Sequence, residues 1–213
     1  MTTPASGRKL VVVSAGLSQP SSTRLLADQL AGAVVDALDQ PAQVRTVELR
    51  EHAHDIVNNL LTGFPSEPLR EVVEAVAGAD GIIAVTPVFN ASYSGLFKSF
   101  FDVLDEGVLA DRPVLAAATG GTARHSLALE HALRPMFTYL RAVVVPTAVF
   151  AASEDWAGGT VDGGLAGGGL AGGGLRRRIE RAAGELAREI GRREPASPPD
   201  PFALTASFDE LLG

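Results

Sequence analysis

Small polar residues gather in three short segments of the chain, and each segment directly follows an apolar run. The first, residues 14–23, reads SAGLSQPSST and carries one glycine among many hydroxyls. Hydroxyl groups and free backbone N–H groups at the start of a helix form an anion site, which the helix dipole strengthens. One terminal phosphate suits this segment, although the same residues are also common in helix caps and turns. Its candidate ligands are Ser14, Ser18, Gln19, Ser21, Ser22 and Thr23.

The second segment, residues 86–98, reads TPVFNASYSGLFK and follows the apolar run GIIAV. Pro87 fixes its own φ and biases Thr86 toward extended backbone, so we expect the strand to end here in a stiff turn. Small residues after the proline allow the main chain to approach a flat aromatic ring closely. The candidate ring contacts are Pro87, Val88, Phe89, Asn90 and Ser92.

The third segment begins at Thr119 and reads TGGTARHS. Gly120 and Gly121 allow backbone N–H groups to approach the carbonyl edge of a flavin ring, where donors stabilise the anionic reduced ring. A tight turn before the next helix is the structural alternative. A phosphate site, a surface for a flat ring and a pair of backbone donors together predict bound flavin mononucleotide, FMN.

Other kinds of chemistry find little support in the sequence. The chain has no cysteine, which excludes disulfides, thiolate metal sites and cysteine nucleophiles. No Ser-His-Asp arrangement or GxSxG motif is recognisable. His52 and His54 lie close together without a further ligand, so we expect solvent-exposed histidines and no metal site. Because hydride transfer to a flavin needs no acid or base from the protein, no catalytic side chain is predicted.

Strands and helices alternate along the chain at the spacing of βαβ units. Short apolar runs predict strands at residues 10–15, 43–49, 80–85, 112–118 and 142–150. Helical spacing predicts helices at residues 21–38, 67–77, 95–104, 123–140 and 176–193, with a kink or a new start at Pro135. Residues 51–65 are irregular, and we expect a long loop there with a short helical piece. This alternation predicts an α/β fold with a doubly wound, five-stranded parallel sheet in the flavodoxin-like order 2-1-3-4-5. In that order the three polar segments meet at one edge of the sheet.

Three further stretches bear on domain organisation. Residues 158–175 contain GGLAGGGLAGGGL, which predicts a flexible surface loop, because glycine at this density disfavours regular structure. We expect one domain over residues 1–193, followed by a tail, residues 194–213, that packs on the domain or on a partner subunit. The wide apolar face of Phe97, Phe100 and Phe101 predicts burial against both the sheet and a partner.

The totals limit the possible partners and compartment. The chain has 213 residues, a formal charge of −7 and a pI near 5.1. An acidic chain is poorly suited to nucleic acid or to anionic lipid, both of which require many lysines and arginines. The sequence shows no signal-peptide core and no run of about 18 apolar residues, so we expect a cytoplasmic protein.

The three polar segments, above all the run PVFNASYSGLFKSFFD from Pro87, resemble the NADPH-dependent FMN reductase family of flavodoxin-like proteins, and most closely its actinobacterial branch. The resemblance implies noncovalent FMN with its phosphate in the first segment, residues 87–90 along the ring and residues 119–121 at the pyrimidine side. It also implies a homodimer or homotetramer that reduces flavin for a partner monooxygenase. Relatives often carry an arginine inside the first segment, whereas this chain has Leu17, Ser18 and Gln19, with Arg24 beyond.

The leading hypothesis is therefore an NAD(P)H-dependent FMN reductase, in which NADPH or NADH donates hydride to the flavin. A quinone, azo or chromate reductase on the same fold is the first alternative. A flavodoxin-type electron carrier and a regulatory protein that has lost flavin are two others. The sequence leaves the preference between NADPH and NADH open, because the four basic residues that could meet a 2′-phosphate could equally be surface charges. These are Arg24, Lys98, Arg124 and Arg134.

Overall fold

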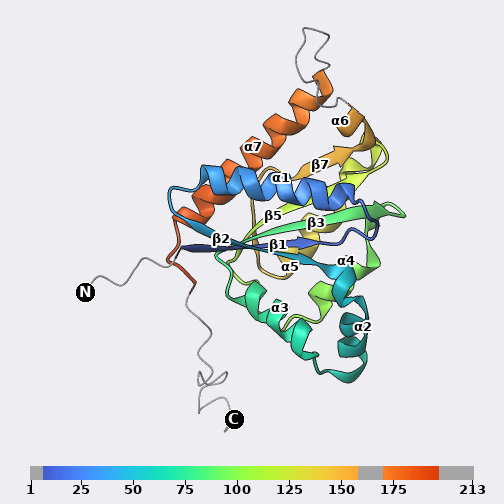
Figure 1. Ribbon diagram of the computed structural model, residues 1–213, viewed down its shortest axis with the longest axis vertical. Coiled ribbons are helices and arrows are strands. Elements are labelled where there is room, and N and C mark those ends of the chain that lie inside the picture. The colour runs from blue at the N-terminus through green and yellow to red at the C-terminus, as the bar shows by residue number, and fades with distance from the viewer. Residues whose placement is uncertain (1–6, 158–169, 197–213) are drawn as a thin grey trace, which may run out of the picture.

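A twisted, mainly parallel sheet forms the centre of the protein (Figure 1). The computed structural model describes residues 7–157 and 170–196. The sheet has seven strands in the order β2-β1-β3-β5-β6, with β7 also pairing with β5 and β4 pairing with β3. This is the flavodoxin-like order, so the predicted fold class is confirmed, although the strand count is seven and not five. The strands are β1 Arg8–Ser14, β2 Ala42–Glu48, β3 Gly81–Phe89, β4 Ser92–Tyr93, β5 Pro113–Gly120, β6 Val143–Val144 and β7 Val149–Ala152.

The two additional strands have local causes. The predicted strand at residues 142–150 is divided into β6 and β7, which both run parallel to β5. Val114 pairs with Val144 and Ala117 pairs with Val149. Two residues of β5 lie between these pairs, opposite four residues of the segment that joins β6 to β7, so this segment bulges outward. Pro146, which has no N–H to donate, lies inside the bulge. The other additional strand, β4, folds back antiparallel on the end of β3.

Helices cover both faces of the sheet (Figure 1). Figure 1 shows α1 and α7 on one face and α2 to α5 on the other. Alternate residues of β1 point into the two cores: Leu10 and Val12 pack with α1 and α7, whereas Val11 and Val13 pack on the opposite face. A strand buried on both faces must be apolar at every position, which explains the continuous apolar run. The helices are α1 Ser22–Ala37, α2 Ala53–Thr62, α3 Glu67–Ala77, α4 Gly95–Asp102, α5 Arg134–Tyr139, α6 Ser153–Ala157 and α7 Leu170–Gly191.

Two predictions of loops were wrong. Residues 51–65 contain α2 in place of the expected loop with a short helical piece. Its apolar residues do recur at helical spacing, as Ile56 with Leu60 and Val57 with Leu61, so the helix had a signal in the sequence; Ile56 is fully buried, whereas the other three side chains are exposed. The second correction concerns the predicted glycine loop at residues 158–175, because α7 already begins at Leu170. Residues 158–169 lie outside the described part of the chain.

The predicted helix at residues 123–140 is a series of three different turns. A 3₁₀ segment over Ala123–Leu127 precedes a π-helical turn over Leu129–Leu133, and α5 follows. Pro135 lies in the first turn of α5, so it marks a new helical start, as predicted. No helix in the described ranges combines the length and the apolar composition that a membrane-spanning segment requires.

The three phenylalanines of α4 are buried inside the chain itself. Phe97 and Phe100 are 0 % exposed and Phe101 is 2 % exposed. The Phe97 ring lies 4.8 Å from that of Phe101 and 6.2 Å from that of Phe137, measured between ring centroids. The prediction that this face meets a partner was therefore wrong, because its side chains fill the core between α4, α5 and the sheet.

Asp80 joins three parts of the chain at the amino-terminal edge of the sheet. One of its carboxylate oxygens accepts hydrogen bonds from Arg8 Nη1 at 3.3 Å and from the Ala196 backbone N–H at 2.7 Å. The other accepts the Lys9 N–H at 2.7 Å. The side chains of Arg8 and Asp80 are 5 % and 4 % exposed. The start of the predicted tail thus contacts the sheet, while residues 197–213 lie outside the described ranges and the division at residue 193 stays a prediction.

Removing the Asp80 carboxylate should destabilise the protein strongly. Asp80→Ala leaves the Arg8 guanidinium buried without its anion, which typically costs about 3–5 kcal/mol of unfolding free energy. The double variant Arg8→Met/Asp80→Leu removes both charges and should recover a large part of that loss. Urea unfolding of the two variants measures the difference. Equal destabilisation by both would show that the ion pair is not the cause.

Candidate functional site

The register of the parallel strands brings the three polar segments to one edge of the sheet. Ser14 at the end of β1 lies beside Val85 of β3. Pro87 of β3 lies beside Thr119 of β5. Gly120 in turn lies beside Ala152, the last residue of β7. The carboxyl ends of four strands therefore converge, and a fourth connection, which begins at Ser153, joins the three that the sequence indicated.

A cavity of about 450 Å³ opens at this edge. Its volume lies within the usual range for small-molecule sites, about 300–1,000 Å³. Hydroxyls line it on the α1 side, and backbone with a few apolar side chains lines it on the β3 and β5 side. The lining residues are Leu17, Ser18, Ser22, Thr23, Pro87, Val88, Phe89, Thr119, Gly120, Gly121, Ser153 and Trp156.

Five predicted site residues lie outside the cavity lining. Ser14 is buried beneath the first loop at 1 % exposure, and Ser21 serves as the N-cap of α1. The Gln19 amide faces the Arg50 guanidinium instead of the cavity. The other two, Asn90 and Ser92, belong to the hairpin that joins β3 to β4.

Three lining residues were missed from the sequence: Leu17, Ser153 and Trp156. Leu17 lies within a segment that was read for its hydroxyls alone. Ser153 and Trp156 follow β7, which is parallel to β5, so its carboxyl end lies at the same edge of the sheet as those of β1, β3 and β5. Trp156 is the single tryptophan of the chain, so its position after the last strand was a usable signal.

β3 continues beyond Pro87, which corrects the prediction that the proline ends the strand. The Val85 carbonyl accepts the Ala15 N–H at 2.9 Å, so Val85 directs its backbone polar groups toward β1. In a strand, the backbone N–H and C=O groups of residues i and i+2 point to the same side, so the backbone of Pro87 also faces β1. β1 has already ended there at Ser14, so the missing N–H of Pro87 leaves no partner unsatisfied.

A tight hairpin then returns the chain toward α4. Asn90 and Ala91 have φ values of 48° and 67°, the left-handed conformation that two-residue hairpin turns require. The buried Thr86 hydroxyl accepts the Ser94 N–H at 3.0 Å, and the Ser94 hydroxyl accepts the Phe97 N–H at 3.2 Å. These bonds fix the hairpin, and with it the backbone of residues 87–89 along the cavity.

The α1 side of the cavity has the features of a phosphate site. α1 is 16 residues long, and its first turn carries Ser22 and Thr23 into the cavity wall. The Ser21 hydroxyl accepts the Arg24 N–H at 3.2 Å and so occupies one of the helix-start donors. Other N–H groups of that turn remain for an anion, and the helix dipole favours negative charge there.

The first loop is joined to the third by a buried hydrogen bond. The hydroxyls of Thr23 and Thr119 lie 2.9 Å apart.

Gly16 keeps the first loop close to α1, since a Cβ at this position would overlap the Ser21 hydroxyl oxygen. A Cβ at Gly120 would lie 2.8 Å from the Phe150 ring, whereas one at Gly121 would meet nothing within 4 Å. Gly16 and Gly120 are therefore required by packing, and Gly121 lies open to the cavity.

A network of ion pairs lies beside the first turn of α1. The Glu48 carboxylate bridges Arg24 Nη1 at 2.5 Å and Arg50 Nε at 2.9 Å. Arg24 also donates to Asp28 at 2.8 Å, and this bond, followed by the charges of Asp28 and Glu48, raises the pKa of the Arg24 guanidinium. The guanidinium charges of Arg24 and Arg50 are balanced by the carboxylates of Asp28 and Glu48, so these ion pairs join α1 to β2 without adding net positive charge.

The other basic residues considered for a 2′-phosphate are already engaged or lie on the surface. Lys98 pairs with Asp102, and Arg134 donates to Glu130 at 2.7 Å and to two backbone carbonyls. Arg124 is exposed on the 3₁₀ segment. Within the described ranges, no three side chains of the kinds that hold metals come together.

The arrangement fits FMN: a helix start with hydroxyls at one end, and flat backbone surfaces with glycine donors at the other. A model of the NADPH-dependent FMN reductase family matches residues 8–157, which include every strand of the sheet and every residue that lines the cavity. The chain belongs to the NADPH-dependent FMN reductase family. The predictions of an oxidoreductase, of FMN as cofactor and of NADPH or NADH as co-substrate are confirmed at the level of this family.

Individual relatives agree with the family. An FMN reductase (NADPH) from Pseudomonas aeruginosa is 38 % identical over 73 % of this chain and 81 % of its own length. The NADH-dependent FMN reductase SfnE from Pseudomonas putida is 36 % identical over 74 % of this chain and 82 % of its own. The crystal structure of an oxidoreductase from Corynebacterium diphtheriae is 46 % identical, covers 88 % of this chain and 99 % of its own, and superposes with a TM-score of 0.81.

Two glycine substitutions should distinguish a glycine that close packing requires, Gly16, from one that faces open space, Gly121. Gly16→Ala forces the Ser21 hydroxyl away from its cap, which should lower the unfolding free energy by about 1–2 kcal/mol. Gly121→Ala adds a methyl group in open space and should change it by less than about 0.5 kcal/mol. Chemical denaturation measures both values. If Gly16→Ala is as stable as the wild type, the close contact between the first loop and α1 is not required.

Proposed function

We propose that this protein is an NAD(P)H-dependent FMN reductase that binds FMN in the 450 Å³ cavity. The observation that carries the proposal is the joining of a helix start, an extended backbone and a glycine turn around one cavity, in a chain of this family. When bound, FMN supplies the acceptor for a hydride from the reduced nicotinamide. The residues of the chain bind and orient the two molecules.

The phosphate end of the cavity is formed by the first loop and the first turn of α1. Ser18, Ser22 and Thr23 present hydroxyls there, and the start of a 16-residue helix adds N–H donors and positive potential. Arg24 and Arg50 lie outside the cavity lining and are held in ion pairs with Glu48. The hydroxyls and the helix start support phosphate binding although the loop itself carries no arginine.

The ring end is formed by backbone. Residues 87–89 are held extended by the hairpin and offer a flat wall, and Gly120 and Gly121 offer N–H groups. The Thr23–Thr119 hydrogen bond keeps this end at a constant separation from the phosphate end. Donors placed in advance lower the cost of reorganisation when charge develops on a bound ring.

The position of the cavity also supports exchange of flavin with a partner. Leu17 and Phe89 line it and are 53 % and 46 % exposed, so the cavity has an open, apolar rim. Exposed apolar side chains beside a ligand site commonly contact a ligand or a partner. We propose that the reduced flavin passes to a flavin-dependent monooxygenase, and that the protein works as a homodimer or homotetramer.

A carboxylate at Ser22 should abolish phosphate recognition specifically. Asp at the start of a helix stabilises the fold, but it places a negative charge where the phosphate should bind. For Ser22→Asp we expect the FMN dissociation constant to rise at least about tenfold, as a loss of 1.4 kcal/mol or more requires. The isosteric control Ser22→Asn should bind FMN nearly as the wild type does. Riboflavin, which lacks the phosphate, should bind both variants alike, and an equal loss for riboflavin would contradict the proposed orientation.

The activity itself is tested by nicotinamide consumption. FMN-loaded protein should oxidise NADH or NADPH in steady state with free FMN as acceptor, because the cavity holds the ring at an open edge. Absorbance at 340 nm measures the rate. Slow oxidation that requires a separate reductase would indicate an electron carrier, and activity with quinones but not with free FMN would indicate the quinone reductase alternative.

A further inference from the structure

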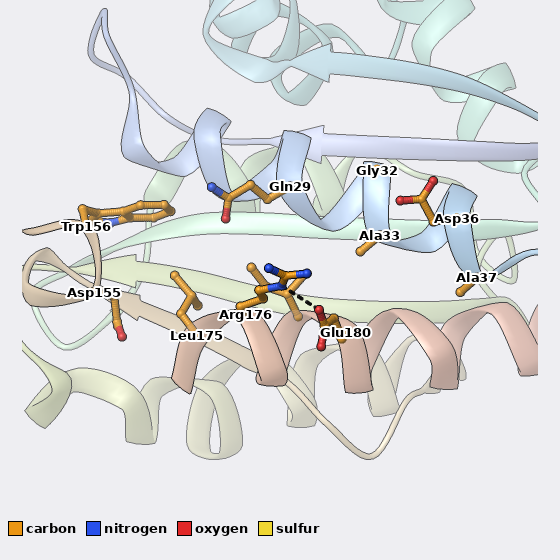
Figure 2. A pocket seen from close by; sticks show the side chains of 11 residues that line it. Gln29, Gly32, Ala33, Asp36, Ala37, Asp155, Trp156, Leu175, Arg176 and Glu180 are labelled. Carbon is orange, nitrogen blue, oxygen red and sulfur yellow. Dashed lines mark hydrogen bonds and ion pairs between the residues drawn. The ribbon is translucent and has the colours of Figure 1, made fainter. Parts of the chain in front are cut away.

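A second hollow, of about 700 Å³, runs between α1 and α7 (Figure 2). Figure 2 shows Trp156 at one end of this groove and Ala37 at the other. It is larger than the cavity assigned to FMN, and none of the roles proposed above involves it, apart from Trp156, which lines both hollows. Its lining residues are Gln29, Gly32, Ala33, Asp36, Ala37, Asp155, Trp156, Leu175, Arg176, Ile179 and Glu180.

The groove adjoins the FMN cavity. Trp156 lines both hollows. On α1, Ser22 lines the FMN cavity, and Gln29 and Asp36 follow at seven-residue intervals, so all three lie along one side of the helix. From Gln29 to Asp36 the helix rises about 10 Å, a length suited to a nucleoside with its phosphates. A ligand that enters the FMN cavity can therefore extend past Trp156 along α1.

The chemistry of the walls suits a nucleoside. Leu175 and Ile179 form a buried apolar floor, with 4 % and 5 % exposure. The Trp156 indole offers an aromatic face on which a base can stack. Gln29 and Asp36 are exposed on α1 and offer amide and carboxylate groups to the polar edges of a base and to ribose hydroxyls.

We propose that this groove binds the adenosine half of the reduced nicotinamide dinucleotide and that it selects NADH over NADPH. This inference rests on the proposed function, because the nicotinamide must reach the FMN cavity. Asp36 makes no ion pair or side-chain hydrogen bond with any residue that the structure describes, so its charge remains available. A carboxylate accepts hydrogen bonds from the 2′- and 3′-hydroxyls of ribose, but repels the 2′-phosphate of NADPH.

Arg176 supplies the charge for the pyrophosphate. Its Nε pairs with Glu180, one turn further along α7, at 2.8 Å, and the two side chains are 82 % and 55 % exposed (Figure 2). An ion pair this exposed contributes little, so the guanidinium can turn to a phosphate at small cost. Asp155, by contrast, is held by Arg178 at 3.2 Å and by the Ala152 N–H at 2.9 Å, which keeps α6 and Trp156 in place.

Filling the groove should weaken NADH binding alone. Gly32 lines the groove and a Cβ there meets nothing within 4 Å, so Gly32→Leu adds a bulky side chain at the groove and removes a helix-destabilising glycine. We expect the KM for NADH to rise at least tenfold, with FMN affinity unchanged. Reduced nicotinamide mononucleotide, which lacks the adenosine, should keep its KM. The matched control is Gly191→Leu, because Gly191 is the last residue of α7, does not line the groove, and an added Cβ there also meets nothing within 4 Å.

Charge at the far end of the groove should set the preference between the two nicotinamides. Asp36→Arg exchanges the repulsion of a 2′-phosphate for attraction. We expect the ratio of kcat/KM for NADPH to that for NADH to rise at least tenfold, while kcat with reduced nicotinamide mononucleotide stays unchanged. An unchanged ratio would overturn the assignment of Asp36.

Direct binding tests the groove independently of activity. ADP-ribose, titrated into flavin-free protein, should bind the wild type and Gly191→Leu, change the fluorescence of the single tryptophan and fail to bind Gly32→Leu. Equal affinity for all three proteins, or an unchanged NADH KM in Gly32→Leu, would overturn the inference. If wild-type protein loaded with FMN oxidises neither NADH nor reduced nicotinamide mononucleotide, the proposed function fails, and the ADP-ribose titration still decides whether the groove binds a nucleoside diphosphate.

Discussion

The register between β1, β3 and β5 is the constraint on which the rest of the site depends. Each strand is paired in parallel with the next, so their carboxyl ends are placed by backbone hydrogen bonds and not by the loops themselves. β1 ends opposite Val85, four residues before the end of β3, and Pro87 lies in the part of β3 that extends beyond β1. A shift of register would move every lining segment relative to the others and would exchange the two faces of each strand.

This ladder is stable because both faces of the sheet are buried. α1 and α7 cover one face, and α3, α4 and α5 cover the other with a cluster of phenylalanine rings. Fully packed layers leave the strand ends as the place where backbone and polar side chains can face a ligand. The Thr23–Thr119 bond is a small addition to this frame, but it joins the helix start to the glycine turn directly.

The tertiary structure also places two hollows on either side of one aromatic residue. Trp156 is held by a short helix that Asp155 anchors to β7 and α7. One side of this helix faces the cavity assigned to FMN, and the other faces the groove between α1 and α7. The two sites proposed above for FMN and for the dinucleotide would therefore be neighbours, as a reaction between the two molecules requires.

The order of the sheet and the three polar segments at its edge follow from the sequence alone. Apolar runs alternate with helical stripes, and parallel strands with such connections have few possible arrangements. Nine of the predicted ligands line the cavity, because a loop after a parallel strand reaches this edge in any doubly wound fold. The helix within residues 51–65 was missed although its apolar residues recur at helical spacing and Gly63 forms a left-handed C-cap; only its start, at His52, lacks a capping side chain.

Other features were decided only by the folded chain. The direction of Gln19 toward Arg50, the role of Ser21 as a cap and the extension of β3 past its proline depend on neighbours that are distant in sequence or on a partner strand that has ended. The same is true of Trp156, whose two cavities exist only because α1, β7 and α7 pack side by side. Local pattern specifies which residues are apolar or polar, but the direction in which a polar side chain points is set by contacts that the sequence does not display.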